Sequence, residues 1–576
     1  MKENVLDFER KLFNRNKWAY SVGGIGRDMV YQLVATFFIT YVQFSGLGLS
    51  AVQFTVIGIM LVVGRIWDAV NDPVMGSIVE NTHTKWGKFR PWILIGALLT
   101  AIVIIFMFNF RPTGWAFVVF FFVMYLFWEM FFTLNDIPYW SLIPALSKNK
   151  KDRDTVTTMV VVFAGVGAFA GNAIITLTTV GRMVRGYSII SFTFAIFFVA
   201  CSLLTVFGVK EPKEVLPEKP VKISIKKMFK VIAKNDQLLW ASLALMLYSI
   251  GSGLLTALGY NFFWLEIGYD GTLTMIFILS FAISNILIQS FYSALAKRFT
   301  RKQLMNFSFI ALAFGYAMML SIGWVDFLPV NIVTACAFGI FVFGGQAIFY
   351  MVVIVNMTNT IEYNEYKTGD RNEAIVFSLR PFVAKMSSAI QGLIVTLVLV
   401  ASGVYVMSQN VSALEQEVSL FNEMTLTEKT NYVNSIQNGL SALSIEEYDA
   451  LSLTGKIDYI YELKQNVSTF ENTTLGDSEL VVLYEALQEP SNEVFTESDN
   501  ATIGWSMTIN KAADSVFLEN ATISMRLFLR LSITVIPALL IFGALYILRK
   551  KYIIDEIYYE EITAITKSRI DNNIAA

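Results

Sequence analysis

Residues 50–80 read SAVQFTVIGIMLVVGRIWDAVNDPVMGSIVE, an apolar run of membrane-spanning length that contains two carboxylates, Asp68 and Asp72. Two further runs of this kind hold Asp136 and Lys385. A charge at the centre of a bilayer costs roughly 2.5–3.5 kcal/mol on insertion scales, so such residues usually face the interior of a helix bundle and handle ions or polar solutes. These four residues therefore predict a membrane transporter.

The composition is that of an integral membrane protein. Hydrophobic residues make up 55% of the 576 positions, and apolar runs of about 20 residues, each long enough to cross a bilayer, recur along the chain. We predict an all-α multipass membrane protein with twelve transmembrane helices. The helices are expected to start near Tyr20, Ser50, Pro91, Trp115, Thr155, Ser188, Asp236, Thr272, Leu304, Pro329, Ala374 and Arg526.

Lys and Arg gather in alternate loops, which fixes the expected orientation. The basic loops cover residues 85–90, 148–153, 210–234 and 297–302. The positive-inside rule places them, and with them both termini, in the cytoplasm. The N-terminal segment is basic but lacks a short apolar core with a cleavage site, so we expect no removable signal peptide and a location in the bacterial cytoplasmic membrane.

Two polar segments divide the chain. The lysine-rich segment at 209–235 predicts a cytoplasmic central loop between two halves, and this arrangement is typical of the major facilitator fold, whose substrate site lies between the halves. Residues 408–525 hold 19 Asp and Glu against 4 Lys and contain no span-length apolar run. This segment predicts an acidic extracytoplasmic insertion, which we expect to be dispensable for transport. The remaining divisions are an N-terminal six-helix half at 1–208, five helices of the C-terminal half at 236–407, a twelfth helix at 526–550 and a cytoplasmic tail at 551–576.

Polar residues form a stripe along the second span. Arg65, Asp68, Asp72 and Gly76 recur at intervals of three and four, with Asn71 beside them, so one face of a helix carries them. Together with Thr133 of the fourth span, they offer the hard oxygen ligands that a small cation takes, and a buried carboxylate pair can hold a proton instead. We predict a site for Na⁺ or H⁺ at Asp68, Asn71, Asp72 and Thr133, with Na⁺ between the two aspartates.

The fourth span carries a second stripe, in which Glu129, Thr133, Asp136 and Trp140 recur at intervals of four, three and four. An indole face covers the C–H surface of a sugar ring, and a carboxylate accepts hydrogen bonds from its hydroxyls. Asp136 and Trp140 are therefore candidates for sugar binding. The alternative for Trp140 is an aromatic anchor at the membrane interface.

Three stretches resemble the glycoside-pentoside-hexuronide:cation symporters of the major facilitator superfamily. They are GRIWDAVNDPVMGSIVENTHTKWGKFRPW at 64–92, NDIPYWSLIPAL at 135–146 and IEYNEYKTGDRNEA at 361–374. The resemblance covers all twelve expected helices and leaves out only the acidic insertion. It implies a symporter that brings a sugar into the cell together with a cation.

The resemblance also implies roles for individual residues. It implies that Asp68, Asp72, Asn71 and Thr133 hold the cation, that Asp28 of the GRD triplet acts with Asp136 and Trp140 on the sugar, and that Lys385 lies near the cation-site carboxylates. One departure concerns Val161, which stands where a sugar-binding arginine is expected. Galactoside specificity therefore does not carry over.

Four charged residues have competing interpretations. Glu129 and Arg380 are candidates for specificity, although a snorkelling interfacial arginine is the favoured interpretation of Arg380. Lys385 and Arg65 are expected to form a charge network with the aspartates. For Arg65 the favoured interpretation is structural: it only neutralises a neighbouring aspartate or forms a gate pair. A network that merely fixes helix packing is the structural alternative.

The leading hypothesis is a secondary active transporter that couples entry of Na⁺ or H⁺ to uptake of a glycoside or oligosaccharide. The alternative is a transporter-like sensor or receptor that uses the insertion to bind a ligand or partner. We expect no enzyme activity, cofactor or nucleic-acid partner, because the chain has no phosphate-binding glycine loop, zinc motif or Ser–His pair. The expected partners are a sugar, Na⁺ or H⁺, and the lipid bilayer, with the monomer as the working unit.

Overall fold

The computed structural model describes residues 2–82, 84–146, 150–210, 235–369, 373–423, 447, 450–452, 455, 495–496, 506–507 and 521–575. Helices dominate these residues. The strands among them are β1 (Phe495–Thr496) and β2 (Ser506–Met507), which pair antiparallel. The central loop predicted at 209–235 lies outside the described residues except at its two ends.

The helices of the first half are α1 (Lys2–Ala35), α2 (Phe38–Gln43), α3 (Ala51–Glu80), α4 (Arg90–Asn109), α5 (Gly114–Ser141), α6 (Ile143–Leu146), α7 (Lys150–Thr179) and α8 (Met183–Gly208). α1 packs against α7 and α8, while α3 and α4 pack against α5. α3 approaches α5 closely because residue 64 is glycine. A Cβ atom there would lie 2.3 Å from Cε1 of Tyr125 on α5.

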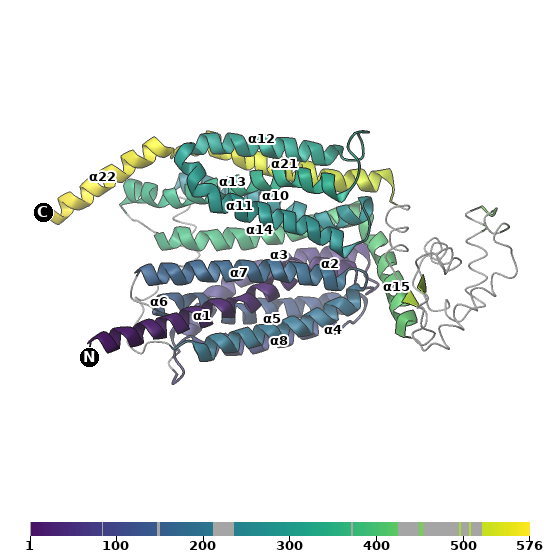
Figure 1. The fold of residues 1–576 in the computed structure, drawn as a ribbon, viewed down its shortest axis with the longest axis horizontal. Helices are drawn as coiled ribbons and strands as arrows, with labels where there is room; N and C mark the ends of the chain where they lie inside the picture. The colour runs from purple at the N-terminus through teal and green to yellow at the C-terminus, as the bar shows by residue number, and fades with distance from the viewer. Residues whose placement is uncertain are drawn as a thin grey trace.

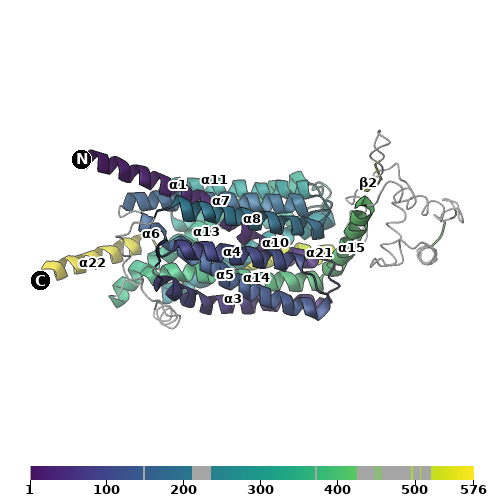
Figure 2. The same cartoon turned by 90° about the horizontal axis from the view of Figure 1, so that it is seen from below.

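The helices of the second half are α10 (Asp236–Glu266), α11 (Gly271–Arg298), α12 (Arg301–Ser321), α13 (Ile332–Thr368), α14 (Glu373–Ala401), α15 (Val404–Glu423), α21 (Ile523–Lys550) and α22 (Glu556–Ala575). α10 packs against α13, α14 and α21, and the halves meet where α14 lies on α3 and α11 on α7. The long helices run side by side (Figure 1, Figure 2). Both termini lie at one end of the bundle and α15 lies at the other, which we call the distal end.

Among the described residues, eleven helices are long and apolar enough to cross a membrane. They match the second to twelfth predicted spans: α13 begins at Ile332 where Pro329 was expected, and α14 begins at Glu373 where Ala374 was expected. α1 is not among the eleven. It begins at Lys2, well before the expected start at Tyr20, and its charged residues include Arg27 and Asp28.

α15 closes the distal end of the bundle by contacting both halves. The predicted start of the insertion at residue 408 falls inside this helix, and most of residues 424–520 lie outside the described part of the chain. The Tyr405 hydroxyl donates to the Leu49 carbonyl at 2.8 Å, and the Ser412 hydroxyl donates to the Phe44 carbonyl at 2.6 Å. The first part of the predicted insertion is therefore packed onto the helix bundle.

A buried amide ties α15 to both halves. Gln43 Nε2 of α2 donates to Ser408 Oγ of α15 and to Asn261 Oδ1 of α10, each at 2.6 Å. All three side chains are at most 2% exposed. The two halves are thus in direct contact at this end of the bundle.

Candidate functional site

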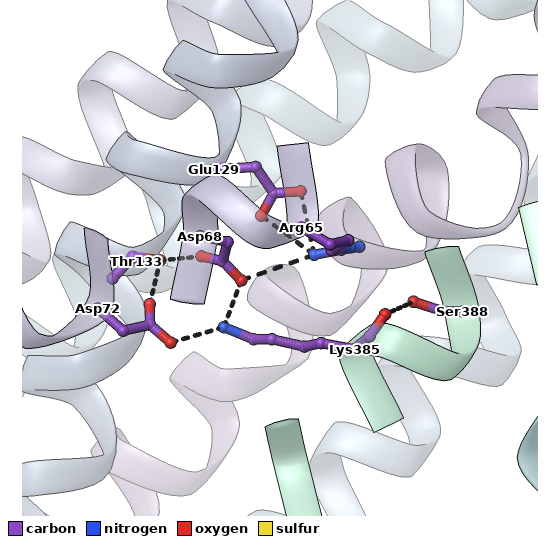
Figure 3. Close-up of polar contacts among 7 residues, drawn as sticks. All are labelled: Arg65, Asp68, Asp72, Glu129, Thr133, Lys385 and Ser388. Carbon is purple, nitrogen blue, oxygen red and sulfur yellow. Dashed lines mark hydrogen bonds and ion pairs between the residues drawn. The ribbon is translucent and has the colours of Figure 1, made fainter. Parts of the chain in front are cut away.

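The two aspartates of α3 meet the lysine of α14 where these helices pack together (Figure 3). Lys385 Nζ lies 2.6 Å from Asp68 Oδ2 and 2.9 Å from Asp72 Oδ2. The Thr133 hydroxyl of α5 lies 3.1 Å from Asp68 Oδ1 and 3.0 Å from Asp72 Oδ1. The four-residue spacing of the aspartates puts both carboxylates on one face of α3, where α5 and α14 reach them.

An arginine and a third carboxylate adjoin this group. Nη1 of Arg65 lies 3.0 Å from each oxygen of Glu129 and 3.9 Å from Asp68 Oδ2. Arg65 and Glu129 are 5% and 3% exposed, so both charges are shielded from water. We call Arg65, Asp68, Asp72, Glu129 and Lys385 the charge cluster. With every group ionised, it carries three negative and two positive charges.

Asn71 lies on α3 next to the charge cluster but is not joined to it. Its side chain is 4% exposed, and its Nδ2 has no hydrogen-bond partner among the residues that the structure describes. Within that part of the chain, no three His, Cys, Asp or Glu side chains are grouped so as to hold a metal ion. The position between Asp68 and Asp72, where Na⁺ was predicted, is taken by the Lys385 ammonium group.

The residues predicted to bind sugar meet around an arginine that the sequence analysis did not select. Arg27 of α1 lies 2.9 Å from Asp28 Oδ2 through Nη2 and 2.9 Å from Asp136 Oδ1 through Nη1. Its Cζ lies 4.7 Å from the ring centroids of both Tyr139 and Trp140. A guanidinium between two carboxylates and over two aromatic faces is the planar geometry that arginine favours. The GRD triplet at 26–28 contained the signal, because Arg27 directly precedes Asp28 in a membrane-length helix.

Three side chains around Arg27 are partly accessible to solvent. The side chains of Asp28 and Asp136 are 22% and 33% exposed, and Trp140 is 37% exposed. Tyr139 is fixed beneath them, because its ring stacks on Tyr20 at 4.4 Å and the two hydroxyls donate to each other's backbone carbonyls. We call Arg27, Asp28, Asp136 and Trp140 the ring cluster.

The remaining predicted residues lie elsewhere. Glu129, a candidate for specificity, lies in the charge cluster and not in the ring cluster, although all four predicted stripe residues come from α5. Arg380 is exposed and donates to the Tyr350 hydroxyl at 2.7 Å. Val161 is 57% exposed on α7.

α5 links the two clusters. Thr133, in contact with both aspartates of the charge cluster, and Asp136, in contact with Arg27, are three residues apart on this helix. That separation corresponds to roughly 4.5 Å along the helix axis. A shift of α5 therefore moves groups in both clusters.

At the distal end, α15 contributes a buried carboxyl. Glu415 is 3% exposed, Oε1 accepts from the Tyr269 hydroxyl and Oε2 accepts from the Met183 amide, each at 2.7 Å. Met183 begins α8 in the first half, whereas Tyr269 lies between α10 and α11 in the second. Burial raises the pKa of Glu415 to about 8.

A helical bundle of two halves with ionised side chains buried at its centre defines a multipass membrane transporter. The chain belongs to the family described as MFS/sugar transport protein, whose model matches residues 19–427. This is a family of transporters and not of enzymes, and the match confirms the resemblance seen in the three sequence motifs.

Several relatives of this chain are named as carriers of sugars or glucuronides. The chain is 29% identical over 434 residues to a lactose permease of Leuconostoc lactis, which covers 69% of this chain and 65% of that protein. It is 24% identical over 411 residues to a raffinose carrier protein of Pediococcus pentosaceus, covering 67% of this chain and 62% of that protein. The chain thus spans just under two thirds of the length of these relatives. A glucuronide carrier protein homolog of Escherichia coli is 24% identical, with coverage of 68% and 84%.

Solved structures support the fold. A bacterial homolog of the human lysosomal transporter Spinster has a TM-score of 0.54 at 11% identity, covering 94% of this chain and 98% of that chain. The nucleoside transporter NupG has a TM-score of 0.51 at 13% identity, covering 69% of this chain and 98% of that chain. These likenesses show a major facilitator-like helical fold.

Proposed function

We propose that this protein is a secondary active transporter that couples inward movement of Na⁺ or H⁺ to uptake of a sugar by alternating access. One observation carries the proposal: the ammonium group of Lys385 lies within 2.9 Å of carboxylate oxygens of both Asp68 and Asp72. A lysine from one half thus occupies the position where a coupling ion would bind to the other half. The ion and the lysine would compete for the same oxygens.

That competition provides a coupling mechanism. Among the described residues, the ion pairs of Lys385 are the salt bridges that join the two halves. A Na⁺ ion bound to Asp68, Asp72 and Thr133, with Asn71 as a further proposed ligand, would neutralise the charge that holds Lys385. Protonation of either aspartate would have the same effect. Binding of the ion would therefore weaken one connection between the halves.

The ring cluster is the proposed sugar site. Asp28 and Asp136 would accept hydrogen bonds from hydroxyls, Arg27 would donate them, and Trp140 would cover one face of the ring. Arg27 supplies a guanidinium that the family pattern places in the fifth span, where this chain has Val161. The relatives named for lactose and raffinose support an oligosaccharide as the substrate.

The proposed topology has twelve spans in two six-helix halves. α1 with α2 would be the first span, since its length and its packing against α7 and α8 match those of the other spans. Basic loops at the end that holds the termini support a cytoplasmic location for that end, in the membrane of a bacterium, with residues 408–525 outside. The buried contacts of Gln43 with Ser408 and Asn261 support a state that is closed at the distal end.

Uptake into proteoliposomes tests the proposal. Purified protein would be given radiolabelled lactose, raffinose, isoprimeverose or a glucuronide, with an imposed Na⁺ gradient, an imposed pH gradient or neither. Accumulation driven by one gradient and lost in Asp72→Asn is the expected result. Exposed Asp326→Asn is the matched control and should accumulate sugar as wild type does. Sugar binding without gradient-driven accumulation would favour the sensor.

A further inference from the structure

We infer that Glu129 is a positioning residue that tunes the cation site by keeping Arg65 from neutralising Asp68. This inference rests on the proposed cation site. It assigns to Glu129 a role in ion affinity and not in the choice of sugar.

Arg65 lies closer to Glu129 than to Asp68. Arg65 precedes Asp68 by one turn of α3, so its guanidinium is within reach of that carboxylate. Instead, Nη1 is 3.0 Å from both oxygens of Glu129 and 3.9 Å from Asp68 Oδ2. Both members of the Arg65–Glu129 pair are at least 95% buried. In such surroundings a charge acts strongly on its neighbours, because little water screens it.

Close packing of two helices creates this pair. Gly64 lets α3 approach α5 at Tyr125, and Glu129 lies one turn beyond Tyr125 on α5. Arg65, directly after Gly64, is thereby brought beside Glu129. Tyr125 is 2% exposed and lies within electrostatic reach of both Arg65 and Glu129.

The pairing of Arg65 with Glu129 determines the net charge left at the proposed cation site. With Glu129 present, Arg65–Glu129 is neutral, and Asp68, Asp72 and Lys385 together carry one negative charge. One Na⁺ or one proton balances that charge. Without Glu129, Arg65 and Lys385 would balance both aspartates, and the electrostatic attraction for an added cation would be lost. Glu129 thus sets the charge of the site without contacting the ion.

Three variants separate this role from a merely structural one. Glu129→Gln gives the charge cluster no net charge, Arg65→Gln gives it two negative charges, and the double variant restores the wild-type value. The order of cation affinity should follow the charge. A packing role predicts weakened binding in all three variants.

The experiment is a NaCl titration of the purified full chain in detergent. Choline chloride keeps the ionic strength constant, and thermal unfolding and tryptophan fluorescence report binding; a parallel titration varies pH. We expect Glu129→Gln to need at least about tenfold more Na⁺, or a midpoint at least about one pH unit lower, because a nearby full charge is lost from a shielded site. Glu129→Asp and the double variant should stay within about threefold of wild type. Arg65→Gln should bind the ion at least as tightly.

The outcomes also separate this inference from the proposed function. If Asp72→Asn abolishes the response while Glu129→Gln matches wild type, the inference is overturned and the cation site stands. A double variant as weak as Glu129→Gln, or an Arg65→Gln variant weaker than wild type, overturns it as well. Arg65→Gln and Glu129→Asp decide the question if Glu129→Gln does not fold. A wild-type protein that responds to neither ion overturns the cation site itself.

Discussion

Replacing Glu415 with Gln should make closure of the distal end independent of pH. The Glu415 carboxyl accepts hydrogen bonds from Tyr269 in the second half and from the Met183 amide in the first, both at 2.7 Å. None of the ion pairs between described residues involves Glu415. Tyr187 is the other titratable group within electrostatic reach. The carboxyl is therefore held by neutral donors in a site with little access to water.

The structure gives the size and the sign of the effect. Burial raises the pKa of Glu415 from 4.5 to about 8, and hydrogen bonds from Tyr269, Met183 and Gly181 offset part of that rise. A difference of this size corresponds to roughly 5 kcal/mol. The raised pKa means that the closed form keeps a proton that an open, hydrated form releases. The equilibrium constant for closure is highest below about pH 4.5. It falls by up to about tenfold per pH unit as the pH rises and stops falling at about pH 8.

Spin labels on exposed positions of the two halves provide the assay. Val52 lies near the distal start of α3 and Val333 near that of α13, and they are 65% and 72% exposed. Both would be changed to Cys in a protein whose own cysteines, Cys201 and Cys336, are replaced by Ala. Double electron–electron resonance from pH 5 to 8 should show the short, closed distance losing population as pH rises.

The Glu415→Gln protein should show one distribution of distances across this range. Asp326→Asn, which removes an exposed acid near the same end, is the matched control and should keep the pH dependence of the parent. An unchanged pH response in Glu415→Gln would refute the assignment to this carboxyl. A parent with no response between pH 5 and 8 would refute the argument from burial.

Three further predictions concern the proposed sites and the insertion. Lys385→Gln should raise Na⁺ affinity in the NaCl titration while abolishing gradient-driven uptake, since the ion no longer competes with an ammonium group; weaker binding would contradict the competition. Arg27→Gln should weaken sugar binding roughly five- to 150-fold by calorimetry, with Arg27→Lys less affected, and equal affinity in all three proteins would place the sugar elsewhere. Replacing residues 424–520 by a glycine-serine linker should preserve uptake and change the apparent affinity for sugar mainly at low salt. A deletion that also removes α15 should disturb closure of the distal end. Loss of uptake at every salt concentration in the linker variant would show that the acidic segment takes part in transport.

Helical periodicity and the family resemblance together predicted the core of the charge cluster. Asp68 and Asp72 share a face of any helix that contains them, and the resemblance implied that Lys385 lies near these carboxylates. The structure brings these three residues together. The choice of Na⁺ or H⁺ does not follow from the oxygens alone, because the same carboxylates accept either.

Features that depend on tertiary packing were not predictable in this way. The pairing of Glu129 with Arg65 depends on the close approach of α3 to α5, which Gly64 permits. Arg27 was not predicted, because its place between Asp28 of α1 and Asp136 of α5 depends on how these two helices pack. α15 contains polar residues on its packed face, among them Ser408, Ser412 and Glu415, so its burial is not evident from hydropathy.

The two halves contribute differently to the proposed sites, and this difference suggests how an ion and a sugar could both influence the movement of one half against the other. The ring cluster comes from α1 and α5, and every carboxylate of the charge cluster comes from α3 or α5. Either ligand could therefore bind within the first half alone. Of the charge cluster, the second half supplies Lys385. An ion that displaces Lys385 changes how the halves are held together, whereas a sugar bound at Asp136 acts on the same helix as Thr133. In the proposed mechanism, coupling would depend on α5 to relate the two sites and on Lys385 to transmit their occupancy to the second half.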